Sequence, residues 1–143
     1  MNLDKILAIS GRPGLYKIIT QTRTGALVES LVDKKRITVG VHNNISVLSE
    51  IAIYTLTQEV PLREVLNKIK FNENSGATSI NHKAGKDALE AYFFDILPDY
   101  DEDRVYASDI KKVIQWYNIL QKNNLLDILK TENEDLKNLE EEE

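Results

Sequence analysis

Residues 51–70 read IAIYTLTQEVPLREVLNKIK, and the apolar rhythm of the chain changes inside this stretch, near residue 57. Up to Thr55, apolar and β-branched residues form short runs, as expected for strands of a sheet that buries one face. After that point, apolar residues recur at helical spacing, at Leu62, Val65, Leu66 and Ile69. The 143-residue chain therefore predicts an α+β fold, in which a sheet unit precedes a helical unit.

The first part of the chain consists of strand-like runs separated by turn residues. After a short opening helix, predicted from the spacing of Leu3, Ile6 and Leu7, these runs cover residues 15–22, 26–31, 36–41 and 51–55. One helical turn is expected at residues 46–50, before the last strand. This pattern predicts a small SH3-like antiparallel β-barrel over residues 1–56, because closure removes the exposed edges of a short sheet. The alternative is an open meander packed on the helices.

The second part predicts a three-helix unit and a tail. A first helix, expected to pack on the barrel, falls in residues 57–72, where Pro61 suits a first helical turn. Residues 73–86 are small and polar without periodicity, which predicts a flexible linker. Residues 87–130 carry two further amphipathic helices, separated at Pro98 and with Ser108 as the expected N-cap of the second. Residues 131–143 are strongly acidic and predict a disordered tail.

Composition excludes several classes of protein. The chain has no cysteine, which removes disulfides, thiolate catalysis and sulfur-bound zinc. No apolar run approaches the roughly 20 residues of a membrane span, and residues 1–5 lack the apolar stretch of a signal peptide. We therefore expect a cytoplasmic protein with no membrane partner and no cofactor.

Charge is distributed unevenly along the chain. Residues 1–56 carry seven basic and four acidic side chains, a net charge of +3, whereas the rest carries eleven basic and nineteen acidic ones, a net charge of −8. A basic run, Lys34, Lys35 and Arg36, lies at an expected hairpin turn. Two interpretations of this run are open: contact with phosphate, and a solvated surface turn. A net charge of +3 is low for a dedicated nucleic-acid binder.

An acidic D-x-D-x-D pattern, Asp99, Asp101 and Asp103, lies between two expected helices and resembles the start of a calcium-binding loop. Such a loop needs glycine at its sixth position and glutamate at its twelfth, and this chain has Arg104 and Ile110 there. These acids are better explained as solvated residues ahead of a helix N-terminus.

The two histidines, His42 and His82, have no second ligand at metal spacing and no serine or aspartate partner that suggests a catalytic set. We therefore assign no catalytic, cofactor-binding or metal-binding residue.

Trp116 is the only tryptophan in the chain. At helical spacing it shares a stripe with Lys112, Ile119 and Asn123, on a different side from Ile110 and the other apolar residues of the same helix. Two interpretations follow. The helix is central and packed on both faces, or Trp116 and Ile119 form a partner-binding patch of the kind that exposed aromatic side chains favour.

Several stretches together resemble a known family. They are ISGRPGLYK at residues 9–17, VESL at 28–31, IYT at 53–55, LPDYDEDRVY at 97–106, SDIKK at 108–112 and WYN at 116–118. The chain is similar, over roughly residues 1–130, to a family of small bacterial proteins classed as a domain of unknown function, with a variable linker and an acidic tail. The resemblance implies no activity, cofactor or catalytic residue.

The sequence thus favours a non-enzymatic binding or adaptor protein that acts on an unidentified protein partner. One alternative is an accessory factor that docks on the transcription or translation machinery through the basic barrel, with nucleic acid as a possible contact. The other is an enzyme or metal-binding protein with an acidic site at Asp99, Asp101 and Asp103. Neither the pathway nor the oligomeric state follows from the sequence. The candidate partner-binding residues are Arg12, Tyr16, Lys34, Lys35, Arg36, Trp116 and Ile119.

Overall fold

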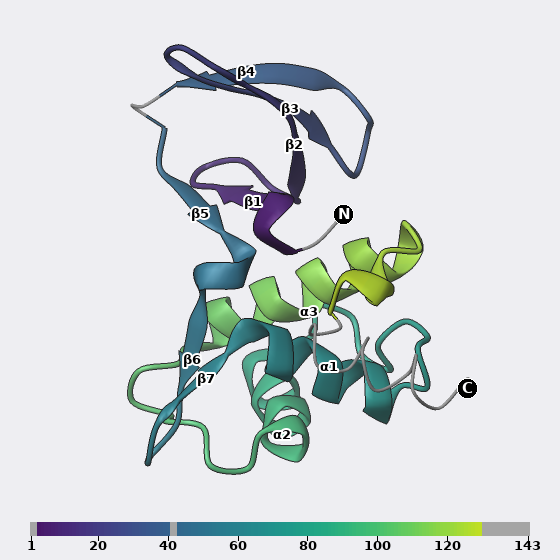
Figure 1. The fold of residues 1–143 in the computed structure, drawn as a ribbon. Coiled ribbons are helices and arrows are strands. Elements are labelled where there is room, and N and C mark those ends of the chain that lie inside the picture. The colour runs from purple at the N-terminus through teal and green to yellow at the C-terminus, as the bar shows by residue number, and fades with distance from the viewer. Residues whose placement is uncertain (1–2, 41–42, 130–143) are drawn as a thin grey trace, which may run out of the picture.

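The computed structural model describes residues 3–40 and 43–129 (Figure 1). Its first part is a curled antiparallel sheet of five strands in the order β4-β3-β2-β1-β5. The strands are β1 Ile6–Ile9, β2 Tyr16–Thr22, β3 Gly25–Ser30, β4 Arg36–Gly40 and β5 Ile45–Val47. Together with three α-helices, this sheet confirms the predicted α+β class.

The opening segment differs from the predicted helix. Leu3–Lys5 forms a single 3-10 turn, η1, and the chain then enters β1. Ile6 is buried in the main core, while Leu7 and Ile9 are buried in a smaller core on the other side of the strand. A strand covered on both faces has no alternation of apolar and polar residues, so its pattern cannot be told from that of a helix.

The predicted SH3-like closed barrel is not confirmed. β4 and β5 are the two edges of the sheet, and within the described residues no ladder joins them. The strand expected to close the barrel, β6 Ala52–Tyr54, pairs instead with β7 Glu59–Pro61 in a separate two-stranded sheet. The reason is local: the Thr55 hydroxyl accepts hydrogen bonds from the backbone N–H of Thr57 (3.3 Å) and Gln58 (2.9 Å), which folds the chain back into a tight hairpin.

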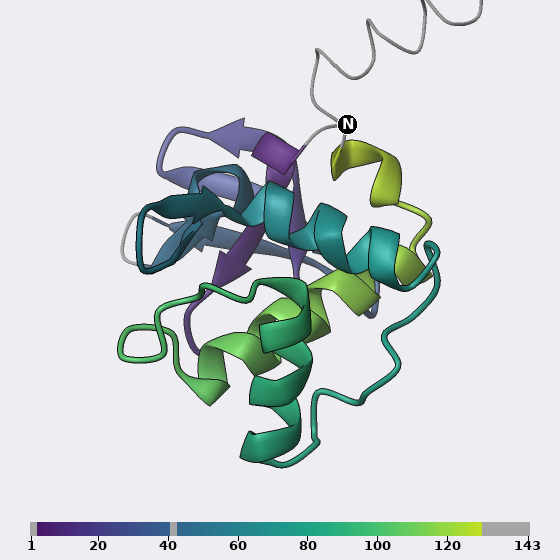
Figure 2. The same cartoon turned by 90° about the horizontal axis from the view of Figure 1, so that it is seen from below.

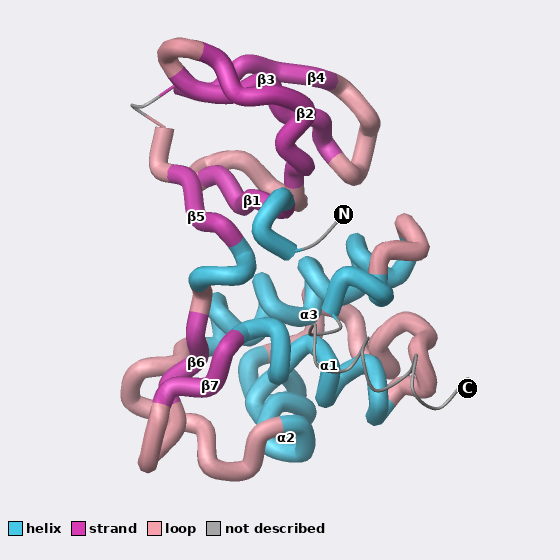
Figure 3. Tube along the Cα trace, viewed as in Figure 1, coloured by secondary structure: helices cyan, strands magenta, loops and turns pink. Residues whose placement is uncertain are grey.

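The helical unit agrees with the sequence in type and order. After the 3-10 turn η2 Leu48–Glu50, the helices are α1 Leu62–Asn72, α2 Lys86–Ile96 and α3 Ala107–Lys122, followed by η3 Leu126–Leu129. Figure 3 shows the five-stranded sheet on one side and the helices on the other, and α1 packs against α2, α3 and η3 (Figure 2). No described helix is both long enough and apolar enough to cross a membrane.

The N-cap of α3 lies two residues before Ser108, the expected N-cap. The structure places Tyr106 at that position, and the Asp109 carboxylate accepts a hydrogen bond from the Tyr106 backbone N–H at 3.0 Å. Asp109 therefore lies in the first turn, as predicted, where its negative charge is stabilised by the helix dipole.

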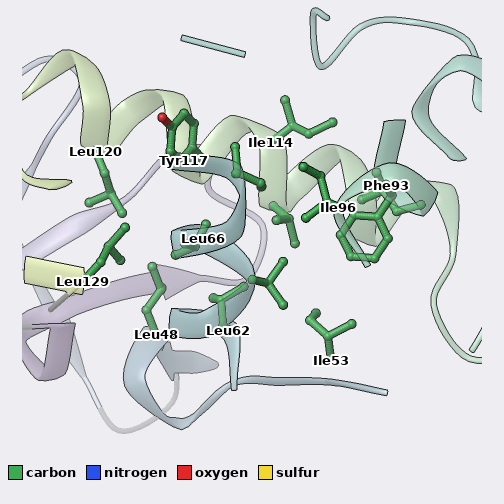
Figure 4. Packing of buried hydrophobic residues seen from close by; sticks show 14 of the residues in the cluster. Leu48, Ile53, Leu62, Leu66, Phe93, Ile96, Ile114, Tyr117, Leu120 and Leu129 are labelled. Atoms are coloured by element: carbon green, nitrogen blue, oxygen red, sulfur yellow. The ribbon is translucent and has the colours of Figure 1, made fainter. Parts of the chain in front are cut away.

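One main core joins the two parts of the chain. It contains Leu3, Leu15 and Leu31 from the sheet side together with the apolar stripes of all three helices. Figure 4 shows ten labelled members of this cluster: Leu48, Ile53, Leu62, Leu66, Phe93, Ile96, Ile114, Tyr117, Leu120 and Leu129. Because burial of this apolar surface is the main stabilising term, the sheet and helical parts depend on each other for stability.

The segment 73–86, predicted as a flexible linker, is irregular but attached to α3. The Tyr117 hydroxyl donates to the Gly76 carbonyl (2.7 Å), and the Asn118 side chain accepts from the Thr78 N–H (3.0 Å). Side-chain bonds to a helix some 40 residues away leave no periodic signal in the sequence, so they could not be predicted from it. The predicted acidic tail, residues 131–143, lies outside the described residues.

Candidate partner-binding site

Two hollows in the surface meet on the outer side of α3. The larger, about 430 Å³, lies between the β1–β2 loop and α3, and the smaller, about 200 Å³, lies between β6 and α3. Lys112 and Trp116 line both. We call the two hollows together the Trp116 groove.

The larger hollow is shaped by the loop Ser10–Gly14, which joins β1 to β2. Gly11 and Gly14 have φ values of +81° and +87°, which residues with a Cβ adopt only at a cost. A Cβ at Gly14 would also lie 3.1 Å from Val32 Cγ2 and 4.0 Å from Ile119 Cδ1. Gly14 therefore lies close to the β3–β4 turn and to α3, and Arg12 lines the hollow.

Trp116 contacts both the core and the surface hollows. Its side chain is half-buried and packs on the main core, while it also lines both hollows. Ile119, one turn further along α3, is half-buried beside Gly14. An aromatic side chain anchored in a core and accessible from a hollow is a rigid contact surface, because binding costs it little conformational freedom.

The smaller hollow has an apolar floor and a cationic rim. Val105 and Val113 are buried and line it, while Tyr54 is 41% exposed. The Arg104 guanidinium lies 5.1 Å from the centre of the Tyr54 ring, and its Nε is 3.5 Å from an Asp101 carboxylate oxygen. This cation–π contact and ion pair hold Arg104 at the rim.

The groove is more basic than the protein as a whole. Among the described residues, its lining contains the cations Arg12, Arg104 and Lys112 and one acid, Asp109, whose carboxylate caps α3, while Asp101 pairs with Arg104 at the rim. The whole chain has a net charge of −5. An acidic ligand would therefore be attracted to this surface in preference to the remainder of the molecule.

The basic run at the β3–β4 turn is largely occupied by internal contacts. Lys34 Nζ donates to the Leu31 carbonyl at 3.1 Å and to the Asn123 side chain at the end of α3. Arg36 Nε lies 3.3 Å from Glu29, which also pairs with Lys17 at 3.1 Å. Lys17 first, and then Arg36, hold the pKa of the Glu29 carboxyl below its usual value. Of the run, only Lys35 is exposed without such a contact.

The structure therefore divides the residues singled out from the sequence. Arg12 and Trp116 line one hollow, and Ile119 lies next to it. Tyr16 is buried in the smaller core and is not available to a partner. The run 34–36 lies near the far end of α3, about two helical turns from Trp116, as the contact with Asn123 shows.

The acidic loop serves to turn the chain. An Asp101 carboxylate oxygen accepts from the Asp103 N–H at 3.0 Å, and the other pairs with Arg104. Among the described residues, no group of three His, Cys, Asp or Glu side chains could hold a metal ion, and His42 lies outside those residues.

Sequence reasoning placed Lys112 on the Trp116 stripe but missed Tyr54, Arg104 and the β6 backbone as parts of the site. The sequence pointed to these parts of the site only indirectly, through the family resemblance. Residues 53–55, 97–106 and 108–112 all belong to the stretches that carry the family resemblance, and the structure brings these three stretches to one hollow.

Comparison with known proteins agrees with this architecture. Residues 3–48 match the family described as Domain of unknown function (DUF5606), and residues 51–120 match Domain of unknown function (DUF6852). The boundary between the two lies at η2, so the hairpin β6–β7 falls with the helices. Among curated proteins, none matched the chain.

One solved structure shows the family to which the chain belongs. The chain is 49% identical to a Bacteroides vulgatus protein that was a target of the Northeast Structural Genomics Consortium and whose structure was solved by solution NMR. The match covers 86% of this chain and 88% of that one, with a TM-score of 0.72. The chain therefore belongs to the same family as that protein, and both of its own matched segments are described as domains of unknown function.

Proposed function

We propose that the chain is a non-enzymatic binding or adaptor protein that holds a protein partner in the Trp116 groove. The observation that carries this proposal is that Trp116 and Lys112 line two adjoining hollows, one of which has an apolar floor. Binding hot spots are aromatic and cationic side chains set in concave apolar surface, and the groove supplies both.

A binding role fits the chemistry of the groove better than catalysis. The ionisable side chains of the lining are Arg12, Tyr54, Arg104, Asp109 and Lys112. Arg104 is engaged with Tyr54 and Asp101, and Asp109 caps α3. Among the described residues of the lining, no nucleophile and base are joined by a hydrogen bond, the arrangement that covalent or acid–base catalysis requires.

We infer that the sheet unit is an opened relative of an SH3-like barrel. In support, the last strand of the sheet returns beside the first, in the order β4-β3-β2-β1-β5, and the ladder between β2 and β3 shifts between Ile18 and Thr20. Such an irregularity bends a sheet toward closure.

Docking on the transcription or translation machinery through nucleic acid has less support. Lys34 and Arg36 are exposed but engaged in internal contacts, and the other exposed cations of the sheet unit, such as Arg12, Arg23 and Lys35, are scattered along the chain. A phosphate-driven complex needs several free cations and weakens steeply as salt is raised.

Reversing the charge of Lys112 should test whether the Trp116 groove, and not another face of α3, binds the partner. With the full chain as bait in a lysate of its native cell, Lys112→Glu is expected to weaken capture of the specific partner by about tenfold, because a cation that lines both hollows becomes an anion. The matched control is Lys111→Glu, an exposed position on the same helix that lines neither hollow.

Both variants should keep the wild-type melting temperature, since both positions are exposed. Bound proteins would be measured by quantitative mass spectrometry at two salt concentrations. Equal loss of the partner in both variants would contradict the proposal, and a complex that disappears steeply with salt in all baits would favour nucleic acid instead.

A further inference from the structure

The larger hollow of the Trp116 groove lies over two small side chains of the sheet. Ala8 in β1 and Ser46 in β5 are directly opposite each other in an antiparallel ladder, so both side chains are on the same face of the sheet. Ala8 packs against the main core, which places that face on the side of the helices. Large side chains at these two positions would fill the space between the strand pair and α3. The sequence therefore leaves the hollow open at the junction of the sheet and helical units.

Two cations from the two units of the chain line this hollow. Arg12 comes from the β1–β2 loop and Lys112 from α3, and the described lining of the larger hollow contains no Asp or Glu. Among the residues that the structure describes, neither cation forms an ion pair, in contrast to Arg104 at the smaller hollow, which pairs with Asp101. Two unpaired positive charges in one hollow attract an anion, and their hydrogen-bond donors remain available to it.

The uncharged polar side chains around the hollow are also available to a ligand. There are four of them among the described lining residues: Ser10, Asn44, Ser46 and Gln115. None of the four hydrogen-bonds through its side chain to another described residue, although the Ser10 N–H donates to the Asn44 carbonyl at 2.9 Å and holds these two residues together. Their hydroxyl and amide groups both donate and accept hydrogen bonds, so they suit the oxygen and nitrogen atoms of a polar ligand.

The size of the hollow and its aromatic wall limit the class of ligand. Its volume of about 430 Å³ lies within the range of roughly 300–1,000 Å³ that is typical of small-molecule pockets, which occur preferentially at the junction between two units. A single acidic side chain of a protein partner would leave most of that volume unfilled. Trp116 supplies an indole ring, against which a second flat ring packs in an offset or edge-on arrangement.

We propose that the larger hollow is a binding site for a small organic anion that carries a flat ring. The anionic group, a carboxylate or a phosphate, binds Arg12 and Lys112 through charge-assisted hydrogen bonds, and the ring lies against Trp116. Ser46 and Gln115 hydrogen-bond to polar atoms of the ligand. A protein partner that covers the Trp116 groove would lie over the bound anion, so the inference adds a second ligand to the proposed function and does not depend on it.

The probe is a panel of aromatic carboxylates and nucleoside monophosphates, each measured beside its neutral analogue, the methyl ester or the nucleoside. Binding to the full, isotope-labelled chain would be followed by the NMR shifts of the Trp116 indole N–H and of the Ser46 and Gln115 amides. We expect saturable binding of at least one of the two classes, with the neutral analogue bound about tenfold more weakly because the contacts of the anion are lost. The class that binds more tightly identifies the anionic group as carboxylate or phosphate.

Two substitutions test the residues that define the site. Arg12→Gln should weaken binding by about tenfold, whereas Arg23→Gln, which removes the same charge at an exposed position that lines neither hollow, should leave binding unchanged. Ser46→Leu should prevent saturable binding by filling the hollow, and its matched control is Thr38→Leu, an exposed position on the opposite edge strand β4. All four positions are exposed, so each variant should keep the wild-type melting temperature.

The failures of the two proposals can be distinguished. No saturable binding by any member of the panel, equal binding of the anions and their neutral analogues, or equal losses in Arg12→Gln and Arg23→Gln would each overturn the anion site. The proposed function would stand in any of these cases if the partner were still lost in Lys112→Glu and kept in Lys111→Glu. A chain that binds the organic anions but captures no protein would retain the anion site and lose the proposed function.

Discussion

Replacing Phe93 by alanine is expected to lower the free energy of unfolding by about 3–5 kcal/mol, the usual cost of a large cavity in a core. Phe93 lies on α2, has no exposed surface, and meets the Tyr100 ring edge-to-face, with centroids 5.0 Å apart and planes at 75°. Tyr100 belongs to the segment that pairs with β6, so the cavity would also loosen the support of the Trp116 groove. Urea denaturation followed by circular dichroism would measure the loss.

The adjacent residue provides the control. Phe94 is 51% exposed, and Phe94→Ala removes the same side chain from the other side of α2. We expect that variant to lose no more than about 1 kcal/mol, since little packing is removed. Equal losses at the two positions would show that α2 does not bury the face seen in Figure 4.

Gly25→Ala is expected to destabilise the protein by about 3 kcal/mol, because a methyl group there has no room. A Cβ at Gly25 would lie 1.8 Å from the Val39 carbonyl oxygen, a backbone atom of the neighbouring strand that cannot turn aside. β3 and β4 would have to separate at this end, where Gly25 faces Gly40. Thermal unfolding and loss of amide protection in β4 would report the effect.

Gly40 is the matched control for this variant. It occupies the opposite position in the same ladder, yet within the described part of the chain a Cβ there would meet the Thr24 carbonyl at 3.7 Å, an ordinary contact. Gly40→Ala should therefore be neutral or stabilising by about 0.4–1 kcal/mol through the unfolded state. If Gly40→Ala were the more damaging of the two, the registry of β3 and β4 would differ from that described.

The helices could be predicted because each buries one face of a regular period. Leu62, Val65, Leu66 and Ile69 are all buried, as their spacing requires. The strands were harder to predict where both faces are buried, because the alternation of apolar and polar residues is then lost. β1 is apolar on both faces, and β6 has only three residues and ends in a turn without glycine, proline or asparagine. Closure of the barrel is not confirmed because β6 pairs with β7, the strand that follows it directly in the chain.

Only some side chains of the candidate site could be predicted from the sequence. Arg12 and Trp116 were singled out by type, and the structure places them in one hollow. Tyr16 was singled out on the same ground, but its strand turns it into the smaller core. The pairing of β6 and Thr55 with residues 99–101 could not be foreseen, because those residues lie more than 40 positions further along the chain.

The most direct test of the account is a photo-cross-linking measurement in the native cell. A photoreactive benzoylphenylalanine placed at Gln115, which lines the larger hollow beside Trp116, would be compared with the same residue at Glu64, an exposed position on α1 that lines neither hollow. The account predicts that irradiation gives one discrete protein adduct from position 115 and none from position 64. Adducts from position 64 alone, or from neither position, would contradict the claim that the Trp116 groove holds a protein partner.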